Sequence, residues 1–291
     1  MNNNKLLIIP RIEVNNANAL SSPYTIGFPA VSSLLGFMHA LERLLNGREG
    51  VNLKFNALLI SCHNFKLHTH SDQQGFYNSI AGTGNPLKKD GSRASFIPEA
   101  RAYMEITLAI QYTGRYIEDN MNDLACNIIH SRLRIAGGDI IKFGEIESIT
   151  IDDDIKFRKL KRKLMPGFVL IERRDLMKDA IADGLDAMDA LLRYLIIYNR
   201  AKQDSNGRAE WSAERYAPGW IVPISTGFYG ISDLHKYAEN QRDPDVPHRF
   251  AEAVITLGEF ILPLRAKSLE EMLWRYSYIC EDDLYICTQN K

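Results

Sequence analysis

Three segments near the start of the chain have the hydrophobic and polar pattern that is typical of β-strands. Residues 6–9 form a short apolar run, which fits a buried strand, and Pro10 limits the pairing directly after it. Apolar and polar residues alternate from 51 to 59, and again from 102 to 110, where the alternation is clearest. These patterns predict three strands.

Three other segments have helical spacing. Between 30 and 45 the apolar residues recur at steps of three and four, and Asn46-Gly47 ends the run, which predicts an amphipathic helix. The apolar positions from 121 to 129 predict a second helix. Residues 152–164 begin with three aspartates and stop just before a Pro-Gly pair, which predicts a short third helix.

Two stretches of the first half show neither period. Residues 11–27 are rich in Asn and Ser, so we predict a long loop there. Residues 69–93 also lack a periodic pattern. Because Asp90-Gly91 is a hairpin turn signal, this segment could form a protruding β-ribbon instead of an irregular loop. A loop of this length in a compact domain is usually functional or disordered.

The second half of the chain is more mixed. We predict a long helix at 175–200, a polar linker at 201–210 and a strand edge at 218–223. Two further segments, 250–262 and 268–276, are predicted to be helical.

Two or three strand-like runs at 133–136 and 140–151, around Gly137-Gly138, follow the second predicted helix. The order of elements in the first half is therefore strand, helix, strand, excursion, strand, helix, strand. This is the order of the split β-α-β plait of ferredoxin-like and RNA-recognition domains. We therefore predict an α+β protein. Residues 1–174 would form an RRM-like palm, with a β-hairpin thumb inserted at about 69–98, and residues 175–291 would form a mixed, partly helical region packed on the palm. The order also makes RNA binding a hypothesis to test.

Composition narrows the class of protein. The 35 Lys and Arg residues nearly balance the 36 Asp and Glu residues, which argues against a protein that coats nucleic acid without regard to sequence, though not against a local basic stripe. No apolar run approaches the roughly 20 residues of a membrane helix, and the first residues hold too few apolar positions for a signal peptide. We predict a cytoplasmic protein with reduced cysteines and no membrane partner.

Six basic residues crowd into residues 156–163. They are Lys156, Arg158, Lys159, Lys161, Arg162 and Lys163. Apolar residues at positions 157, 160 and 164 would dock one face of the helix, so the cations would point outward and could bind a phosphate backbone. The alternative is a solvated face balanced by the aspartates at 152–154.

Two motifs suggest ligand contact. Arg132 and Arg134 precede Gly137-Gly138, where backbone without Cβ atoms could approach a ligand or form an anion nest. A plain hairpin or bulge is the alternative. A polar stretch near Arg11 could read base edges or sugar hydroxyls through amides and hydroxyls, although the same residues also make ordinary turns. Its members include Asn16, Asn18, Ser21 and Ser22.

The sequence offers little for catalysis or metal binding. The cluster of Cys62, His63, His68 and His70 resembles a zinc ligand set only superficially. No second Cys or His pair with zinc-ligand spacing stands near it in the sequence. His39 lies among apolar helix positions, where a half-buried imidazole is the plain interpretation, and general acid or base work beside an RNA strand is the other. We predict no catalytic residue, no metal and no cofactor.

Several longer strings resemble one known family. They include Asn-Ala-Asn-Ala-x-Ser-Ser-Pro followed by Gly-Phe-Pro, and the strings at 132–140, 163–168, 218–224 and 248–260. In this order they are similar to the handle-capping subunits of type I-F CRISPR (Csy) surveillance complexes, within the Cas-five family. The similar strings span nearly the whole length of the chain.

The resemblance implies a non-catalytic RNA-binding subunit that caps the 5′ handle of the CRISPR RNA. It also implies pairing with the large and backbone subunits, and target DNA recognition by guide pairing in the assembled complex. The excursion at 69–98 would be the thumb. The implied RNA contacts are Arg11, Asn16, Asn18, Ser21, Ser22, His39, Arg132, Arg134, Gly137 and Gly138. The implied thumb, partner or nucleic-acid contacts are Lys88, Lys89, Arg93 and the cations from Arg158 to Lys163.

Two other functions stay open at this point. Some members of the wider family process repeat RNA, so a metal-independent endoribonuclease with His39 as acid or base is one alternative. A protein-binding scaffold, whose basic stripe balances an acidic partner, is the other.

Overall fold

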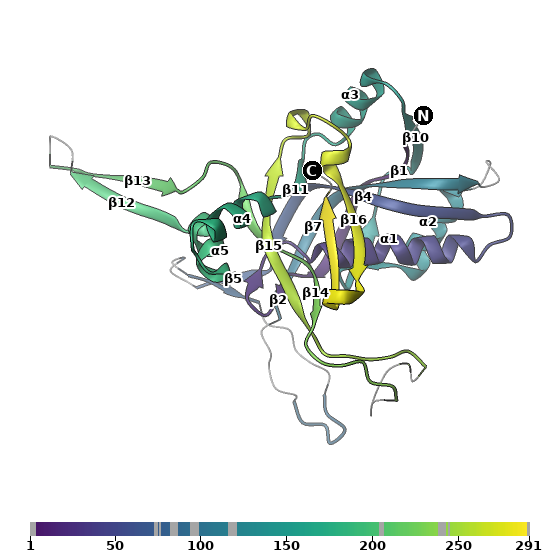
Figure 1. Cartoon of the computed structure of the whole chain (residues 1–291), viewed down its shortest axis with the longest axis horizontal. Helices are drawn as coiled ribbons and strands as arrows, with labels where there is room; N and C mark the ends of the chain where they lie inside the picture. Colours follow the sequence, from purple (N-terminus) through teal and green to yellow (C-terminus); the bar gives the residue numbers. More distant parts are fainter. Residues whose placement is uncertain are drawn as a thin grey trace.

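The computed structural model describes residues 4–72, 75, 77–81, 87–93, 99–115, 121–203, 207–237, 243 and 245–289. Within these residues eleven strands form one antiparallel sheet (Figure 1). In order across the sheet they are β11 (Phe168–Glu172), β15 (Ala251–Ile261), β14 (Ile221–Gly230), β17 (Leu284–Gln289), β16 (Leu273–Ile279), β4 (Asn52–Leu67), β7 (Arg101–Arg115), β1 (Asn4–Asn18), β9 (Gly138–Lys142) and β8 (Arg134–Ile135), with β10 (Glu147–Ile151) paired to β1.

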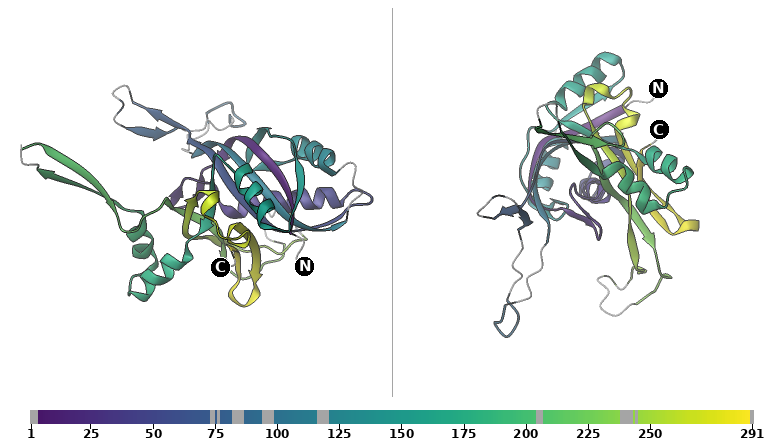
Figure 2. Two further views of the ribbon diagram at one scale, coloured as in Figure 1. Left: turned by 90° about the horizontal axis from the view of Figure 1, so that it is seen from above. Right: turned by 90° about the vertical axis from the view of Figure 1, so that its left-hand side faces the viewer.

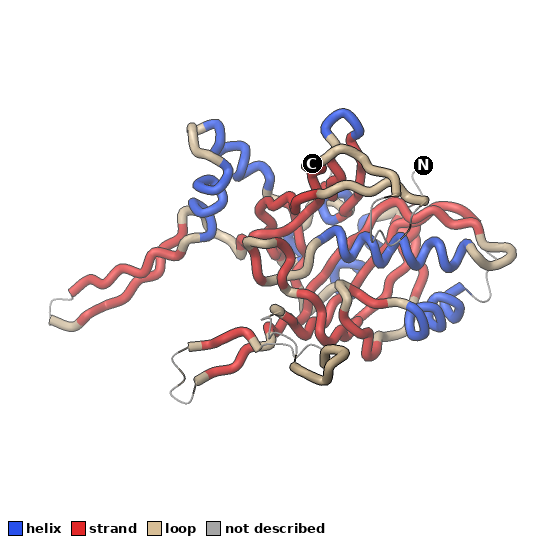
Figure 3. Tube along the Cα trace, turned by 90° about the horizontal axis from the view of Figure 1, so that it is seen from below, coloured by secondary structure: helices blue, strands red, loops and turns tan. Residues whose placement is uncertain are grey.

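Both faces of the sheet bury apolar side chains. Successive residues of β1 alternate between two cores, because Ile9 lies in the larger core and Ile8 in the smaller core on the opposite face. Helices α1 (Val31–Asn46) and α2 (Met121–Arg132) pack on the larger core, and α3 (Asp154–Lys163) packs on the smaller. Figure 3 shows α1 lying along the face of the sheet.

The predicted elements of the first half are confirmed, mostly with longer bounds, and so is the α+β class. The apolar run at 6–9 lies in β1, the alternating segments lie in β4 and β7, and the three helical segments are α1, α2 and α3. The aspartates at the start of α3 act as predicted, because the Asp153 side chain accepts a hydrogen bond from the Lys156 amide at 2.6 Å.

The prediction of a long loop at 11–27 was wrong. β1 continues to Asn18, and a short hairpin of β2 (Leu20–Ser22) and β3 (Thr25–Ile26) follows it. The pairing of β1 with β7 shifts register twice, near Arg11 and near Asn16, and both residues have positive φ, at 52° and 57°. These bulges insert unpaired residues, so the strand alternation cannot be read straight through the segment.

The prediction of one long helix at 175–200 was also wrong. The segment holds two helices, α4 (Arg174–Ala182) and α5 (Ala187–Leu195), and then enters strand β12 (Ile197–Gln203). The break falls at Gly184, whose φ is +91°, and the Asp186 side chain caps α5 by accepting from the Asp189 amide. The linker predicted at 201–210 is also wrong, since it belongs largely to a ribbon of β12 and β13 (Ala209–Arg215); its residues 204–206 lie outside the described residues.

The two C-terminal helix predictions were wrong, because both segments pair with strands that are distant in the sequence. Residues 250–262 are mainly strand β15, which pairs with β11 on one side and β14 on the other. Gly258 fits there because a Cβ atom would lie 2.9 Å from Ile224 Cδ1. Residues 268–276 hold a single 3₁₀ turn, η2 (Glu270–Met272), and the start of β16. The remaining 3₁₀ turns are η1 (Pro263–Arg265) and η3 (Cys280–Asp282).

Two ribbons project from the body (Figure 2). One is the β12–β13 ribbon, and the other is formed by β5 (Thr69–Ser71) and β6 (Asn78–Ile80) at the start of the predicted thumb. The turn signal at Asp90-Gly91 is confirmed, because the Gly91 amide bonds the Lys88 carbonyl at 2.9 Å. Other parts of the thumb prediction, at 73–74, 76, 82–86 and 94–98, lie outside the described residues.

No helix in the described part of the chain is both long enough and apolar enough to cross a membrane.

Candidate functional site

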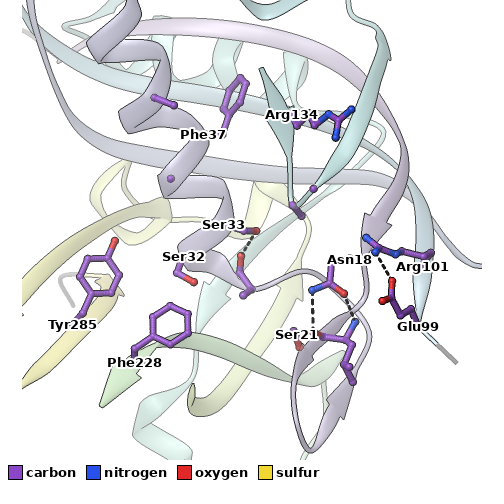
Figure 4. A pocket seen from close by; sticks show the side chains of 16 residues that line it. Asn18, Ser21, Ser32, Ser33, Phe37, Glu99, Arg101, Arg134, Phe228 and Tyr285 are labelled. Atoms are coloured by element: carbon purple, nitrogen blue, oxygen red, sulfur yellow. Dashed lines mark hydrogen bonds and ion pairs between the residues drawn. The ribbon is translucent and has the colours of Figure 1, made fainter. Parts of the chain in front are cut away.

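A groove of about 990 Å³ opens where the first turn of α1 meets the ends of several strands. Figure 4 shows it from close by, with Phe228 and Tyr285 on one side and Arg101 and Glu99 on the other. Its lining residues are Asn18, Leu20, Ser21, Ala30, Ser32, Ser33, Gly36, Phe37, Ala40, Glu99, Arg101, Arg134, Ala136, Gly137, Phe228 and Tyr285. Segments far apart in the sequence therefore build one site.

One wall of the groove is polar and locally ordered. The Asn18 side chain donates to the Leu20 carbonyl and accepts from the backbone N–H of Leu20, each at 3.1 Å. The backbone N–H of Asn18 donates to the Ala136 carbonyl at 2.8 Å. The Ser21 hydroxyl bonds the Thr25 hydroxyl at 2.8 Å. These bonds fix the β2–β3 hairpin beside the groove, so its amides and hydroxyls have set positions.

Two arginines line the groove from β7 and β8. Arg101 pairs with Glu99 at 2.5 Å, and Arg134 pairs with Asp139 at 3.1 Å. The Arg134 side chain is 70% exposed. Because a guanidinium has five N–H donors, a single carboxylate leaves donors for a ligand. The pairs orient both cations without using up their hydrogen-bonding capacity.

The Gly pair has a structural explanation as well as a place in the groove. Residues 136 and 137 form the two-residue turn between β8 and β9, and both have positive φ, 49° at Ala136 and 73° at Gly137. A Cβ atom on Gly138 would lie 2.6 Å from the Asn15 carbonyl oxygen. The hairpin alternative is therefore confirmed, and the same turn brings Gly137 to the groove.

The start of α1 forms the floor of the groove. No side chain caps this helix, and the Ser33 hydroxyl donates to the Ala30 carbonyl at 2.7 Å instead. The first amides of a helix lack intrahelical acceptors, and the helix dipole makes this end positive. Gly36 has nothing within 4 Å of its Cβ position, so this face of α1 stays smooth. The floor thus favours a negatively charged ligand.

The opposite wall is aromatic. Phe228 of β14 is directly paired with Tyr285 of β17, and the Phe228 ring is 44% exposed. The Tyr285 ring stacks on Tyr276, with 6.0 Å between centroids and 27° between planes. Burial, with a smaller effect of the neighbouring Cys287, raises the pKa of Tyr285, so its phenol stays protonated and donates hydrogen bonds.

Of the ten predicted RNA contacts, four meet in this groove. They are Asn18, Ser21, Arg134 and Gly137. Asn16 lies at its edge, where the Asn16 carbonyl accepts from Arg101 at 3.5 Å. Ser22 is buried and bonds the Thr25 hydroxyl at 2.7 Å, and Gly138 is held against β1.

Three further predicted contacts lie elsewhere. His39 is exposed on α1, with its ring 6.2 Å from that of Tyr276. Arg132 is exposed in a separate shallow recess that it shares with Arg48. Arg11 donates to Glu105 at 3.1 Å and to the Met165 carbonyl at 3.2 Å.

One histidine of the superficial zinc set, His63, has structural hydrogen-bond partners near Arg11. The ring of His63 bonds the Pro166 carbonyl through Nδ1 at 2.6 Å and the Thr107 hydroxyl through Nε2 at 2.7 Å. A carbonyl only accepts, so Nδ1 carries the proton. Burial is the main cause that lowers the pKa of His63, and the Arg11 cation adds to it. Within the described residues no three potential ligands gather as a metal site.

The predicted basic face of α3 is partly neutralised. Lys156 pairs with Asp152 at 2.7 Å, Lys163 pairs with Glu147, and Lys161 donates to the Ala266 carbonyl at 3.2 Å. The other three cations of the face are exposed, and they are Arg158, Lys159 and Arg162. Lys88, Lys89 and Arg93 of the thumb segment are exposed too. Neither group lines the groove.

The groove residues that the sequence did not single out come from other segments. They include Ser32, Ser33, Arg101, Phe228 and Tyr285. Ser32 and Ser33 stand at the start of a predicted helix and Arg101 directly before a predicted strand, so their places at element ends were the available signal. The aromatic pair had none, because the strand edge predicted at 218–223 covers only the start of β14 and stops before Phe228, and β17 was not predicted.

Comparison with known proteins shows similarity to one family and to a curated relative. The family described as CRISPR-associated protein (Cas_Csy2) matches residues 7–287. The chain is also similar to the CRISPR-associated protein Csy2 of Pseudomonas aeruginosa (strain UCBPP-PA14), with 32% identity over 312 residues that cover 96% of this chain and 94% of the relative.

Proposed function

The chain belongs to the Csy2 family of CRISPR-associated proteins, and on this basis we propose that it is the subunit of a type I-F surveillance complex that caps the 5′ handle of the CRISPR RNA. In this role it binds one constant end of the guide, while guide pairing selects the foreign DNA. Its protein partners are the large and backbone subunits, and it meets target DNA in the assembled complex.

The groove carries this proposal. Single-stranded RNA is bound through its phosphates and through bases that stack on aromatic rings. Arg101 and Arg134 on one side, and the positive end of α1 at the floor, would bind the phosphates. Phe228 and Tyr285 stand on the other for the bases, and the polar wall at Asn18 and Ser21 supplies hydrogen bonds. We limit the proposed handle contacts to this set and its edge.

The order of the central elements supports a ferredoxin-like palm. The neighbouring strands β4, β7, β1 and β9 carry α1 and α2 on one face, and α1 joins β1 to β4. The projecting β5–β6 ribbon follows β4 and precedes β7 in the sequence, at the position of the proposed thumb, which supports that proposal. The exposed cations of the thumb and of α3 are proposed to contact partners or nucleic acid in the complex.

A binding role without turnover fits the chemistry of the lining. The Arg101 cation is oriented by Glu99, and the raised pKa of Tyr285 keeps its phenol neutral. These groups hold and donate rather than abstract a proton from a ribose hydroxyl. His39, the residue on which the endoribonuclease alternative depends, points to Tyr276 outside the groove lining.

The adjacent residues Phe228 and Tyr229 offer a matched test. Both are about half exposed, but only Phe228 lines the groove. Each is changed to alanine in the full chain, co-expressed with the large subunit, and titrated with labelled handle RNA. A base stacked on Phe228 is worth about 1–3 kcal/mol, which predicts binding weaker by about 5- to 150-fold for Phe228→Ala.

The expected result for Tyr229→Ala is an affinity equal to that of the unmodified protein. Equal affinities for both variants would overturn the groove as the handle site. RNA that is cut by the unmodified protein but not by His39→Ala would favour the endoribonuclease instead.

A further inference from the structure

The β12–β13 ribbon projects from the body with every residue of both strands exposed (Figure 1). A two-stranded ribbon on its own is only marginally stable in water. Its base is held firmly, because the Tyr216 ring packs edge-on against Tyr194, with centroids 5.4 Å apart, and lies under the Arg193 guanidinium at 5.1 Å. The ribbon is therefore aimed outward by a fixed base.

The two faces of the ribbon differ in character. The register places Ala201 opposite Trp211 and Asn199 opposite Ala213, and residues two apart on a strand share a face. One face thus carries five apolar side chains, from Ile197, Ala201, Ala209, Trp211 and Ala213, together with Asn199, Gln203 and Arg215. The Trp211 side chain is 71% exposed. Strands with this alternation normally bury their apolar face.

The other face is polar and balances its own charge. Arg200 pairs with Glu214 at 3.3 Å, and Lys202 stands directly opposite Glu210 in the register. A surface for nucleic acid needs cations that are available for phosphates. Both cations of this face stand near carboxylates, and Arg215 is the one cation that the two strands place on the apolar face. The ribbon therefore offers few cations for phosphates, which favours a protein partner over RNA or DNA.

A second apolar strip leads into the ribbon from α5. Met188, Leu192 and Ile196 follow one another at four-residue steps, and each is at least 38% exposed. Ile196 directly precedes the first residue of β12. Exposed aspartates at 183, 186 and 189 lie near the strip in the sequence, and Asp183 pairs with Arg193 at 2.6 Å. The carboxylates of Asp186 and Asp189 remain as an acidic edge, which repels phosphates and complements basic side chains.

We propose that the β12–β13 ribbon is a docking arm that inserts into an apolar cleft of another protein subunit, with Trp211 as its anchor. The cleft is wide enough for an indole ring and has basic side chains at its rim, facing Asp186 and Asp189 at the start of α5. Exposed apolar patches of this kind commonly mark protein interfaces, and tryptophan is a frequent anchor.

The arm alone is too small for a standard protein interface. Seven residues per strand give an arm about 23 Å long. One face of a narrow arm falls short of the roughly 800 Å² that each partner contributes to a standard interface. The strip on α5 therefore belongs to the same contact. The proposal shares with the proposed function only the multi-subunit complex and does not depend on the RNA groove.

Photocrosslinking separates the candidate partners. The change Trp211→p-benzoylphenylalanine puts the probe on the apolar face, and Tyr198→p-benzoylphenylalanine puts it on the polar face as a matched control. Each full chain is co-expressed with the other complex subunits and a guide RNA, purified and irradiated. We expect the Trp211 probe to join a different protein subunit, with at least several-fold more product than the Tyr198 probe.

Three crosslinking results would overturn the docking arm: a product with RNA, a product with a second copy of this chain, or no product from the Trp211 probe. As a second measurement, Trp211→Ala should weaken binding of the crosslinked subunit by about 10-fold or more, while Tyr198→Ala leaves it unchanged. Equal affinities for these two variants would also contradict the proposal. The affinity of both variants for handle RNA is measured as well, because that affinity tests the groove and not the docking arm.

Discussion

Replacing Arg134 with glutamine tests whether the cationic wall of the groove holds RNA phosphates. Arg134 stands at the mouth of the groove with its side chain 70% exposed, so its loss leaves the core of the fold intact. For single strands each phosphate contact contributes about 0.7 to the slope of log affinity against log salt. Arg134→Gln should lower the slope by this amount, and the double change with Arg101→Gln by about 1.4.

The loss of affinity follows from the same geometry. A hydrogen bond to a charged group is worth about 1.5–3 kcal/mol, and exposure together with the Asp139 partner puts Arg134 near the lower end. The expected loss is therefore about tenfold for Arg134→Gln. Arg101 is less exposed, and its removal leaves the Glu99 carboxylate unpaired beside the RNA, so Arg101→Gln should cost more.

The assay is fluorescence anisotropy of labelled handle RNA with the full chain and the large subunit, between about 50 and 200 mM salt. Arg48→Gln is the control, because Arg48 is exposed near the opposite end of α1, away from the groove. A salt slope that is unchanged in both groove variants, or lowered equally by Arg48→Gln, would refute the assignment of this wall to phosphates.

Two further predictions concern stability. A Cβ atom on Gly138 would meet the backbone of Asn15 and Ala17 at 2.6–2.7 Å, so Gly138→Ala should lower the free energy of unfolding by about 2–3 kcal/mol. A Cβ atom on Gly137 would meet only the Arg101 guanidinium, at 3.9 Å, but φ there is +73°, so Gly137→Ala should lower it by about 1 kcal/mol. Equal urea midpoints for the two variants would contradict this. The pKa of His63 lies below its ordinary 6.5 in the folded state, so the unfolded chain binds this proton more readily and stability should fall as pH drops through 6.5. His63→Gln should flatten that pH dependence of the urea midpoint, and an unchanged slope would show that another group causes it.

The first half of the fold could be predicted because its signals are local. The helix at α1 shows its apolar spacing, and the strands β4 and β7 alternate cleanly. The strand β1 was only partly found, since the bulges at Arg11 and Asn16 shift its period. An apolar segment that pairs on both sides, such as β15, has no alternation that separates it from a buried helix.

Only part of the groove could be predicted, for the same reason, since four of its sixteen lining residues were named from the sequence. Asn18, Ser21 and Gly137 stand in short motifs with turn chemistry, which a sequence displays directly. Phe228 and Tyr285 meet only because β14 pairs with β17. The sequence around either residue gives no signal for that pairing. Long-range pairing of this kind decides which side chains share a site, and it depends on the whole sheet.

The most direct test of the handle-binding groove is to map where the handle touches the protein. A guide RNA with 4-thiouridine in its handle is assembled with the full complex, irradiated and digested, and the crosslinked peptides of this chain are identified. We predict crosslinks in peptides that contain residues 18–37, 101, 134–137, 228 or 285. Crosslinks confined to the thumb segment or to α3, with none at the groove, would contradict the account.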